Sequence, residues 1–283
     1  MGLFEDLCQN AGVKPQIVLI GGGNMAKAMC NGFLKSGLVR KENIAVSNPL
    51  QTSDLKELGI AFHTSNRELL EKYGVNSVVV ICVKPHIVPV VLKEEASLLR
   101  KCGILVSVAA GVTIDSMKEM VASELLPIVR TVPNTPASIG CGATVISCND
   151  RCSIEQTNLV ENLMKTFGIC EKLPERLLNA VTGLSGSGPA YIYTIIDALS
   201  DGGVKMGLPR DISIRLAAQM IKGASSLVLE SNKHPGELKN AVTSPGGTTI
   251  AGVHVLEEKG VRSAMISAVE AGTKRAIELG QQK

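Results

Sequence analysis

Short β-branched runs alternate with segments of helical periodicity through the first 173 residues, and this alternation constrains the fold more than any other sequence feature. Each run has the length of a strand, and each is followed by a stretch long enough for a helix. Strands and helices that alternate in this way predict a mostly parallel, doubly wound sheet with helices on both faces. The expected strands span residues 16–20, 44–47, 78–83, 104–108, 128–132 and 143–147.

From residue 174 onward the sequence changes to long stretches rich in Ala, Leu, Ile and Gly, with no obvious strand pattern. Apolar residues fall on more than one face of the segments 190–207 and 212–229, and a helix that is apolar all round must be buried on all sides. We therefore expect these helices to pack against a second copy of the chain, with a compact monomeric bundle as the alternative. The expected helices span residues 191–206, 211–229, 248–259 and 261–279.

The first expected strand leads directly into a glycine-rich turn, Gly21-Gly22-Gly23-Asn24-Met25-Ala26, which opens a helical segment. This is the GxGxxA form of the dinucleotide-binding turn. Gly21 permits the tight turn, Gly23 lets the backbone approach a pyrophosphate, and the small Ala26 lets helix and strand pack closely. The phosphates would lie on the helix N-terminus, where free N–H groups favour negative charge. A glycine-rich turn without a ligand is the alternative.

The fold class that follows is α/β with two unlike parts. We expect a Rossmann-like, NAD(P)-binding domain over residues 1–173 and an all-helical domain over residues 174–283, which serves dimerisation and substrate binding.

The cofactor is expected to be NADPH, with NADH as the alternative. The second expected strand ends in Val46-Ser47-Asn48-Pro49, where an NAD-specific fold would usually carry an acid for the ribose 2′-hydroxyl. No carboxylate there would repel a 2′-phosphate, and no Arg stands beside it to hold one. Two more loops, 83–85 and 109–111, follow strand ends and carry small residues that suit contact with ribose and nicotinamide; ordinary turns are the alternative for each.

Composition excludes several other classes of protein. A net charge of +3 with 2% aromatic residues leaves no basic footprint for nucleic acid and few stacking platforms. The longest apolar stretches, at 78–83 and 104–114, are too short to span a membrane, and residues 1–15 lack the apolar segment of a secretory signal. The eight cysteines form no CxxC pair and no four-ligand spacing with the four histidines, so we expect buried, reduced thiols, no metal site and a cytoplasmic protein.

Three later segments resemble pyrroline-5-carboxylate reductase: Val132-Pro133-Asn134-Thr135-Pro136, residues 182–191 (TGLSGSGPAY) and residues 242–249 (VTSPGGTT). The resemblance runs from about residue 17 to residue 279. It implies reduction of 1-pyrroline-5-carboxylate to L-proline with NAD(P)H, the last step of proline biosynthesis. It also implies a helical domain that interlocks with a partner's to form a homodimer, often a building block of larger rings, with the active site between the cofactor domain and the dimer interface.

The same resemblance implies site residues by position. The implied cofactor contacts are Ile20, Gly21, Gly22, Gly23, Asn24, Met25, Asn48, Asn66, Cys82, Val83, Lys84, Pro85, Val108, Ala109 and Ala110. The implied substrate contacts are Glu175, Thr248 and Thr249; Glu175 could equally begin a helix as a first-turn acid. Ala241 departs from the family, which often has Asp or Asn at this place near the cofactor.

The turn at residues 244–249 favours the same chemistry on its own. Ser244, Gly247, Thr248 and Thr249 would open a helix whose unpaired N–H groups can bind a carboxylate without Lys or Arg, although a plain N-cap is the alternative. Hydride transfer to a C=N carbon depends mostly on positioning. We assign the amides of Thr248 and Thr249 to the carboxylate and the Thr249 hydroxyl to the ring nitrogen.

Two other functions fit the general pattern. A β-hydroxyacid dehydrogenase would share a dinucleotide domain followed by helices and would need a catalytic lysine early in the second domain; Lys205 is present, but its neighbours match the reductase. A non-catalytic nucleotide sensor would keep the fold with a damaged Gly21, Gly23 or 244–249 turn, and all of these are intact.

Overall fold

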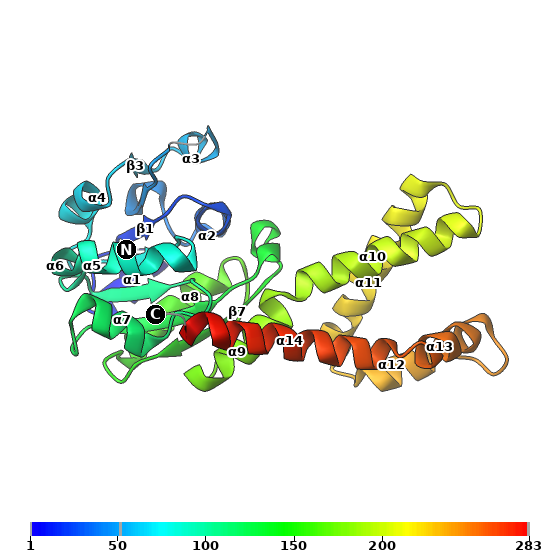
Figure 1. Cartoon of the computed structure of the whole chain (residues 1–283). Helices are drawn as coiled ribbons and strands as arrows, with labels where there is room; N and C mark the ends of the chain where they lie inside the picture. The colour runs from blue at the N-terminus through cyan, green and yellow to red at the C-terminus, as the bar shows by residue number, and fades with distance from the viewer. Residues whose placement is uncertain (1, 51–52, 282–283) are drawn as a thin grey trace. The chain divides into compact units, whose positions relative to one another are not determined.

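A computed structural model describes residues 2–50 and 53–281 (Figure 1). Its central feature is an eight-stranded sheet with the order β3-β2-β1-β4-β5-β6-β7-β8. The strands from β1 to β6 run parallel, β7 runs antiparallel to β6, and β8 is parallel to β7. The strand bounds are β1 (Ile17–Ile20), β2 (Ile44–Ser47), β3 (Ala61–His63), β4 (Val78–Ile81), β5 (Ile104–Ser107), β6 (Ile128–Val132), β7 (Gly142–Cys148) and β8 (Gly168–Lys172).

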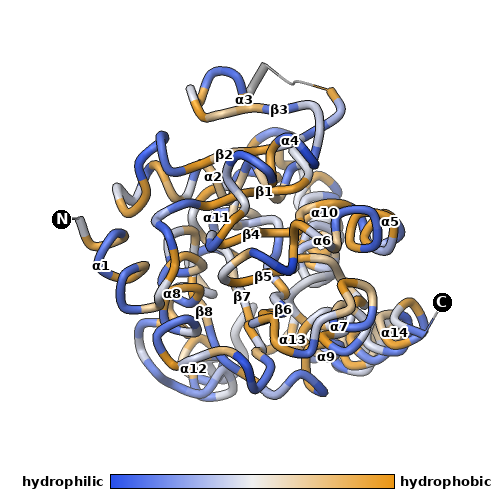
Figure 2. The backbone as a smooth tube through the Cα atoms, turned by 90° about the vertical axis from the view of Figure 1, so that its left-hand side faces the viewer, coloured by the Kyte–Doolittle hydropathy of each residue, from blue (hydrophilic) through white to orange (hydrophobic). Residues whose placement is uncertain are grey.

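Side chains of the central strands alternate between two apolar cores, one on each face of the sheet. In β1, Ile17 and Leu19 join one core, which α1 (Leu3–Asn10), α2 (Asn24–Lys35) and α8 (Ile154–Lys165) cover. Val18 and Ile20 join the other. Burial on both faces explains why β1 and β4 are continuously apolar, as their orange colour in Figure 2 shows. The helices over the second core are α4 (Asn66–Tyr73), α5 (Val88–Glu94), α6 (Ala96–Leu99) and α7 (Ile114–Val121).

The described residues fall into two compact units. The first runs through Gly186 and takes in Gly272 onward, and the second covers Ser187–Ala271. The first compact unit continues past residue 173, because η4 (Glu175–Leu177), α9 (Leu178–Val181) and the π-helical turn η5 (Thr182–Gly186) pack with it. The boundary at residue 173 between a cofactor domain and a dimerisation domain stays a prediction.

The second unit is helical, as expected. Its helices are α10 (Gly188–Lys205), α11 (Arg210–Ser231), α12 (Pro235–Ala241), α13 (Thr248–Glu258) and the first part of α14 (Val261–Gln281). The helix α11 is long and apolar enough to cross a membrane by length and composition alone, which is weak support for a span. This helix is longer than the apolar stretches at 78–83 and 104–114, which the sequence alone presents as the longest.

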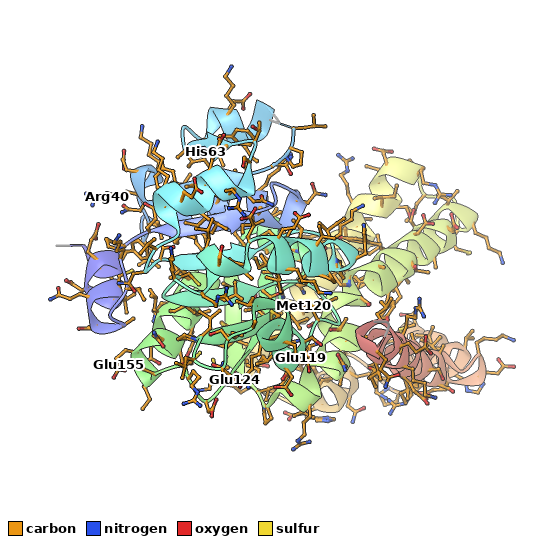
Figure 3. The ribbon with its side chains drawn as sticks, turned by 60° about the vertical axis from the view of Figure 1, so that its left-hand side comes forward. Arg40, His63, Glu119, Met120, Glu124 and Glu155 are labelled. Atoms are coloured by element: carbon orange, nitrogen blue, oxygen red, sulfur yellow. The ribbon has the colours of Figure 1, made fainter. Side chains whose placement is uncertain are left out.

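All six expected strands occur, together with two that the sequence analysis missed. The strand β3 has three residues, all half-buried, and ends at His63, which Figure 3 labels. The strand β8 lies at the other edge of the sheet, and its Glu171 and Lys172 are exposed. Both are edge strands, which bury little apolar surface, so neither leaves a strong alternating pattern in the sequence.

The expectation that the cysteines are buried is correct for half of them. All eight are free thiols. Cys8, Cys30, Cys102 and Cys170 are buried, whereas Cys82, Cys148 and Cys152 are half-buried and Cys141 is exposed. Desolvation raises the pKa of each buried thiol to about 12, which keeps it protonated.

Cys148 and Cys152 form a thiol pair between the end of β7 and the start of α8. A hydrogen bond from Cys152 holds the pKa of Cys148 below its ordinary value, and the Thr157 hydroxyl, whose Oγ1 lies 3.5 Å from the Cys148 sulfur, acts in the same direction. The positive charge of Lys172 adds to the effect, while desolvation opposes it. The neighbouring Cys148 sulfur and burial both raise the pKa of Cys152, whose Sγ lies 3.4 Å from Asn149 Oδ1 and 3.5 Å from the carbonyl oxygen of Ile128.

We therefore expect Cys148 to react with iodoacetamide ahead of the buried thiols at neutral pH, because the thiolate is the nucleophile. Labelling of the native protein, followed by peptide mass spectrometry, should show Cys148 modified well ahead of Cys30 and Cys102. Its rate should stay high below pH 8, where an ordinary thiol loses reactivity, and Thr157→Val should shift the rate profile to higher pH. A profile like that of free cysteine would contradict the assignment.

Candidate functional site

The predicted cofactor residues lie at one edge of the sheet, in the loops that follow the carboxyl ends of adjacent parallel strands. The strand order reverses between β1 and β4, since β1 pairs with β2 on one side and with β4 on the other. Open parallel sheets bind ligands at such a reversal. The predicted contacts to the cofactor lie at the end of β1, in the loops after β1, β2, β4 and β5, and at the starts of α2 and α4.

The turn after β1 is held against the end of β4. Gly21 has φ +103°, and a Cβ there would come within 2.9 Å of the backbone nitrogen of Val83. Gly23, the N-cap of α2, has open space around the position of a Cβ and is exposed. Gly21 is therefore needed by the protein itself, whereas a side chain on Gly23 would enter the space from which a phosphate approaches the free N–H groups of α2. These residues fit a dinucleotide.

The corner formed by β2 and α4 presents neutral polar groups. Asn48 Oδ1 accepts a hydrogen bond from the Gly22 amide at 3.1 Å, which ties this loop to the glycine turn. Ser47 Oγ donates to Asn66 Oδ1 at 2.7 Å. The Asn66 oxygen is thereby used, and its Nδ2 group is left as a donor at the first residue of α4. Hydrogen-bond donors at a helix start suit the ribose hydroxyls or a 2′-phosphate.

The loops after β4 and β5 continue the same edge. The amide of Cys82 donates to the carbonyl of Ile20 at 2.8 Å, and the amide of Val108 donates to Ile81 at 3.1 Å. Lys84 and Pro85 are exposed, while Ala109 is buried and its amide is held by Ser107 Oγ at 3.2 Å. Backbone hydrogen bonds thus place four successive loops side by side.

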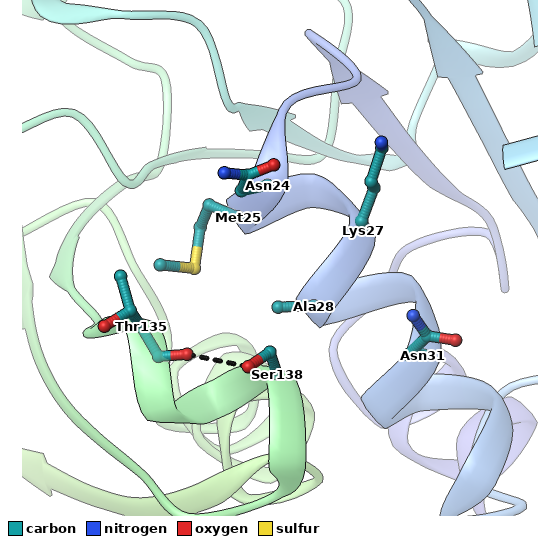
Figure 4. A pocket seen from close by; sticks show the side chains of 7 residues that line it. All are labelled: Asn24, Met25, Lys27, Ala28, Asn31, Thr135 and Ser138. Carbon is teal, nitrogen blue, oxygen red and sulfur yellow. Dashed lines mark hydrogen bonds between the residues drawn. The ribbon is translucent and has the colours of Figure 1, made fainter. Parts of the chain in front are cut away.

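A pocket of about 310 Å³ lies between α2 and η3 (Thr135–Ile139), next to the glycine turn. Figure 4 shows Met25 reaching across from α2 toward Thr135. Ser138 Oγ donates to the Thr135 carbonyl at 3.0 Å, which closes one wall. Sequence reasoning assigned no contact to the residues of this pocket apart from Asn24 and Met25, although the segment 132–136 was part of the family resemblance. The lining residues are Asn24, Met25, Lys27, Ala28, Asn31, Thr135 and Ser138.

Glu175 begins η4, and its carboxylate is engaged within the first unit. Oε1 accepts a hydrogen bond from the amide of Ile114 at 2.8 Å and pairs with Nη1 of Arg130 at 3.1 Å. Its side chain is 28% exposed, so part of the carboxylate remains open to solvent. The predicted contact between Glu175 and substrate stays a prediction.

The predicted substrate turn lies in the second unit, between α12 and α13. Gly246 has φ +67°, and the amide of Gly247 donates to the carbonyl of Ser244 at 3.1 Å, so residues 244–247 form a tight turn. Gly247 is the N-cap of α13 and provides no side-chain cap. The first N–H groups of α13, those of Thr248 and Thr249, therefore have no partner within the helix. The Thr249 side chain is half-buried, whereas Ser244 and Thr248 are exposed.

Other polar groups are placed less favourably for chemistry. Lys205, the last residue of α10, is exposed. Ala241 ends α12 and is exposed. Among the described residues, no cluster of three or more His, Cys, Asp or Glu side chains could hold a metal ion.

Comparisons with known proteins agree with this arrangement of two unlike units. Residues 175–279 match a family model described as pyrroline-5-carboxylate reductase dimerisation, and residues 16–111 match one described as NADP oxidoreductase, coenzyme F420-dependent. The chain is 44% identical over 266 residues to pyrroline-5-carboxylate reductase 2 of Bos taurus, covering 92% of this chain and 82% of the relative. The pyrroline-5-carboxylate reductase of Pisum sativum is also 44% identical, covering 92% of this chain and 94% of the relative.

A solved structure shows the same similarity. The pyrroline carboxylate reductase of Plasmodium falciparum, determined with NADP bound, has a TM-score of 0.85 and 31% identity to this chain. The match covers 94% of this chain and 98% of that one.

The two outer glycines of the turn should respond differently to substitution. Gly23→Val should leave the unfolding temperature nearly unchanged but weaken NADPH binding by a hundredfold or more, because the side chain occupies the approach of the phosphates. Gly21→Val should lower the unfolding temperature as well, because of its positive φ and the contact with Val83. Fluorescence titration with NADPH and thermal unfolding measure both effects. Unchanged NADPH affinity in Gly23→Val would contradict the role of this turn.

Proposed function

The chain belongs to the pyrroline-5-carboxylate reductase family, and on that basis we propose that it reduces 1-pyrroline-5-carboxylate to L-proline with NAD(P)H, the final step of proline biosynthesis. The observation that carries the proposal is the pairing of an open glycine turn at a strand reversal with a second, uncharged turn that presents helix N–H groups. The first suits a dinucleotide and the second a small carboxylate. No observation favours a β-hydroxyacid dehydrogenase, because Lys205 is exposed at the end of α10. None favours a non-catalytic nucleotide sensor, because the residues of both turns are intact.

The cofactor residues proposed are those at the carboxyl edge of the sheet. The amides of the α2 start would hold the pyrophosphate, and the corner of Ser47, Asn48 and Asn66 would hold the ribose near the adenine, with NADPH preferred because no carboxylate is present there. The reduced nicotinamide supplies the hydride when bound. The full set is Ile20, Gly21, Gly22, Gly23, Asn24, Met25, Asn48, Asn66, Cys82, Val83, Lys84, Pro85, Val108, Ala109 and Ala110.

The substrate is held by the start of α13. The amides of Thr248 and Thr249 bind its carboxylate, supported by the helix dipole and by the turn that Ser244 and Gly247 close. A site of this kind binds the anion without a lysine or arginine. Glu175 is proposed to orient the substrate from the first unit through the exposed part of its carboxylate.

Thr249 is the proposed catalytic residue. Its hydroxyl hydrogen-bonds the ring nitrogen, as a donor to the neutral imine or as an acceptor from the N–H of the protonated imine, and so holds the imine carbon toward the hydride donor. A threonine hydroxyl is too weak an acid to protonate an amine alone, so it relays a proton from water, or the imine binds already protonated.

The second unit requires a partner. The family model that matches it describes a dimerisation domain. In the single chain its helices expose many large apolar side chains, and only Ser200, Ser213 and Ala217 of α10 and α11 are buried. We propose a homodimer in which a second copy covers these faces, and its assembly into a larger ring. The exposed apolar residues are Ile192, Tyr193, Leu199, Met206, Leu208, Ile214, Leu216, Met220, Leu227, Leu229, Val242, Ile250, Val255, Leu256, Met265 and Ile266.

A cytoplasmic location is proposed from the thiols. All eight cysteines are free, which suits a reducing compartment.

Absorbance of the reduced nicotinamide tests the activity directly, with purified protein, 1-pyrroline-5-carboxylate and either NADPH or NADH. We expect oxidation of the cofactor, and Thr249→Val should lower kcat by about tenfold to a hundredfold with little change in NADPH affinity. Thr248→Val is the matched control, because it keeps the amide that binds the carboxylate. Binding of both cofactors without oxidation would overturn the proposed reaction, and equal losses in the two variants would overturn the role of Thr249.

Multi-angle light scattering tests the assembly. We expect at least a dimer at micromolar concentration, and Leu216→Glu in α11 should increase the monomer fraction, because a charge would then be buried in the interface. The exposed Lys205→Glu serves as a control for added negative charge. A monomeric wild-type chain would contradict the burial argument.

A further inference from the structure

Arg130 is the largest of the fully buried side chains among the described residues, and it carries a charge. Its guanidinium donates through Nη1 to Glu175 Oε1 at 3.1 Å and through Nη2 to Asn179 Oδ1 at 3.0 Å. Its Nε is buried and has no hydrogen-bond partner within the described part of the chain. Glu175 and Asn179 are four residues apart, so η4 and α9 present both acceptors to one arginine.

Arg130 lies in a row of three polar residues on β5, β6 and β7, where α7 and α9 contact the sheet. In β6 it is in register with Ser107 of β5 and with Ser147 of β7, and both serines are buried. Residues in register on neighbouring strands point to the same face of a sheet. Ser107 Oγ in turn accepts a hydrogen bond from the amide of Ala109, one of the predicted cofactor contacts.

Glu175 connects Arg130 to the far end of the loop that follows β5. Its Oε1 accepts from the amide of Ile114, the first residue of α7, directly after the N-cap Thr113. The segment from Val108 to Thr113 is thus fixed at both ends, by Ser107 at its start and by the Arg130–Glu175 pair at its finish. Between these points the backbone turns at Gly111, which has φ +79°.

Stability alone does not explain this arrangement. A buried ion pair contributes little net stability, and apolar residues of similar volume often stabilise a core as well or better. Arginine offers instead a rigid fork of donors, which fixes the geometry of two acceptors at once. The arrangement is therefore suited to setting the position of a loop.

We propose that Arg130 is a positioning residue for the nicotinamide half of the cofactor. Through Glu175 it fixes the start of α7, and with Ser107 it sets the backbone of the Val108–Ala110 loop on which that half would rest. The proposal rests on the proposed function, because it takes the cofactor to bind at this edge of the sheet. The adenosine half would be held by the loops after β1 and β2, to which Arg130 makes no hydrogen bond among the described residues.

Binding of the whole cofactor and of its adenosine half separates positioning from a general loss of structure. The probes are NADPH and 2′,5′-ADP, and their Kd values are measured by calorimetry on the full-length oligomer. Arg130→Met should weaken NADPH by about tenfold or more while the Kd of 2′,5′-ADP changes less than twofold. Arg130→Lys, which keeps the charge and loses the fork, should show a smaller loss of the same kind.

Ser147→Ala is the matched control, since it removes a buried polar group from the same row without breaking a bond to Glu175. It should leave both Kd values unchanged. Equal weakening of NADPH and 2′,5′-ADP in the Arg130 variants would overturn the proposal in favour of a structural role, and unchanged NADPH affinity would overturn it outright. If Arg130→Met does not fold, Arg130→Lys decides between the same outcomes.

The wild-type chain separates this inference from the proposed function. Suppose the wild-type protein binds NADPH and oxidises it with 1-pyrroline-5-carboxylate, and the Arg130 variants bind NADPH with unchanged Kd. This result overturns the inference about Arg130 and leaves the proposed function intact. Wild-type protein that binds no NADPH overturns the cofactor assignment, and the inference with it.

Discussion

Parallel hydrogen bonding between β1 and its two neighbours is the constraint on which the nucleotide edge depends. Ile20 stands in register with Ser47 of β2 and with Ile81 of β4, so all three strands end at the same level. The amides of Gly21 and Cys82 continue these two ladders by one bond each. The loops after the three strands therefore lie next to one another. Gly21 is required in the middle loop because the backbone after β4 passes too close for a side chain at this position.

Much of this edge could be predicted from the sequence because its signals are local. A buried parallel strand appears in the sequence as an apolar run, which predicts β1 and β4 close to their observed bounds. The glycine turn is a recognisable motif, which predicts the start of α2. The Arg130–Glu175 pair could not be predicted, because its members are 45 residues apart and an arginine within a strand gives no sign of its partner. The pocket beside η3 could not be predicted either, because it forms where α2 contacts a segment that lies more than a hundred residues later in the sequence.

For the helical unit, the sequence predicts the helices but not what packs against them. Its helices were predicted because their apolar content is high, yet apolar residues on every face do not say what covers them. The side chains of α10, α11 and α13 are left exposed in the single chain, and in the proposed homodimer the stability of this unit would depend on protein concentration.

The reversed direction of β7 has a practical consequence. Because β7 runs antiparallel to β6, its last residue, Cys148, stands beside Val129, near the start of β6. That places the activated sulfur at the edge of the sheet opposite the nucleotide loops. A fluorophore attached to Cys148 would lie at the end of the sheet remote from the nucleotide loops, and would report on this end of the first unit.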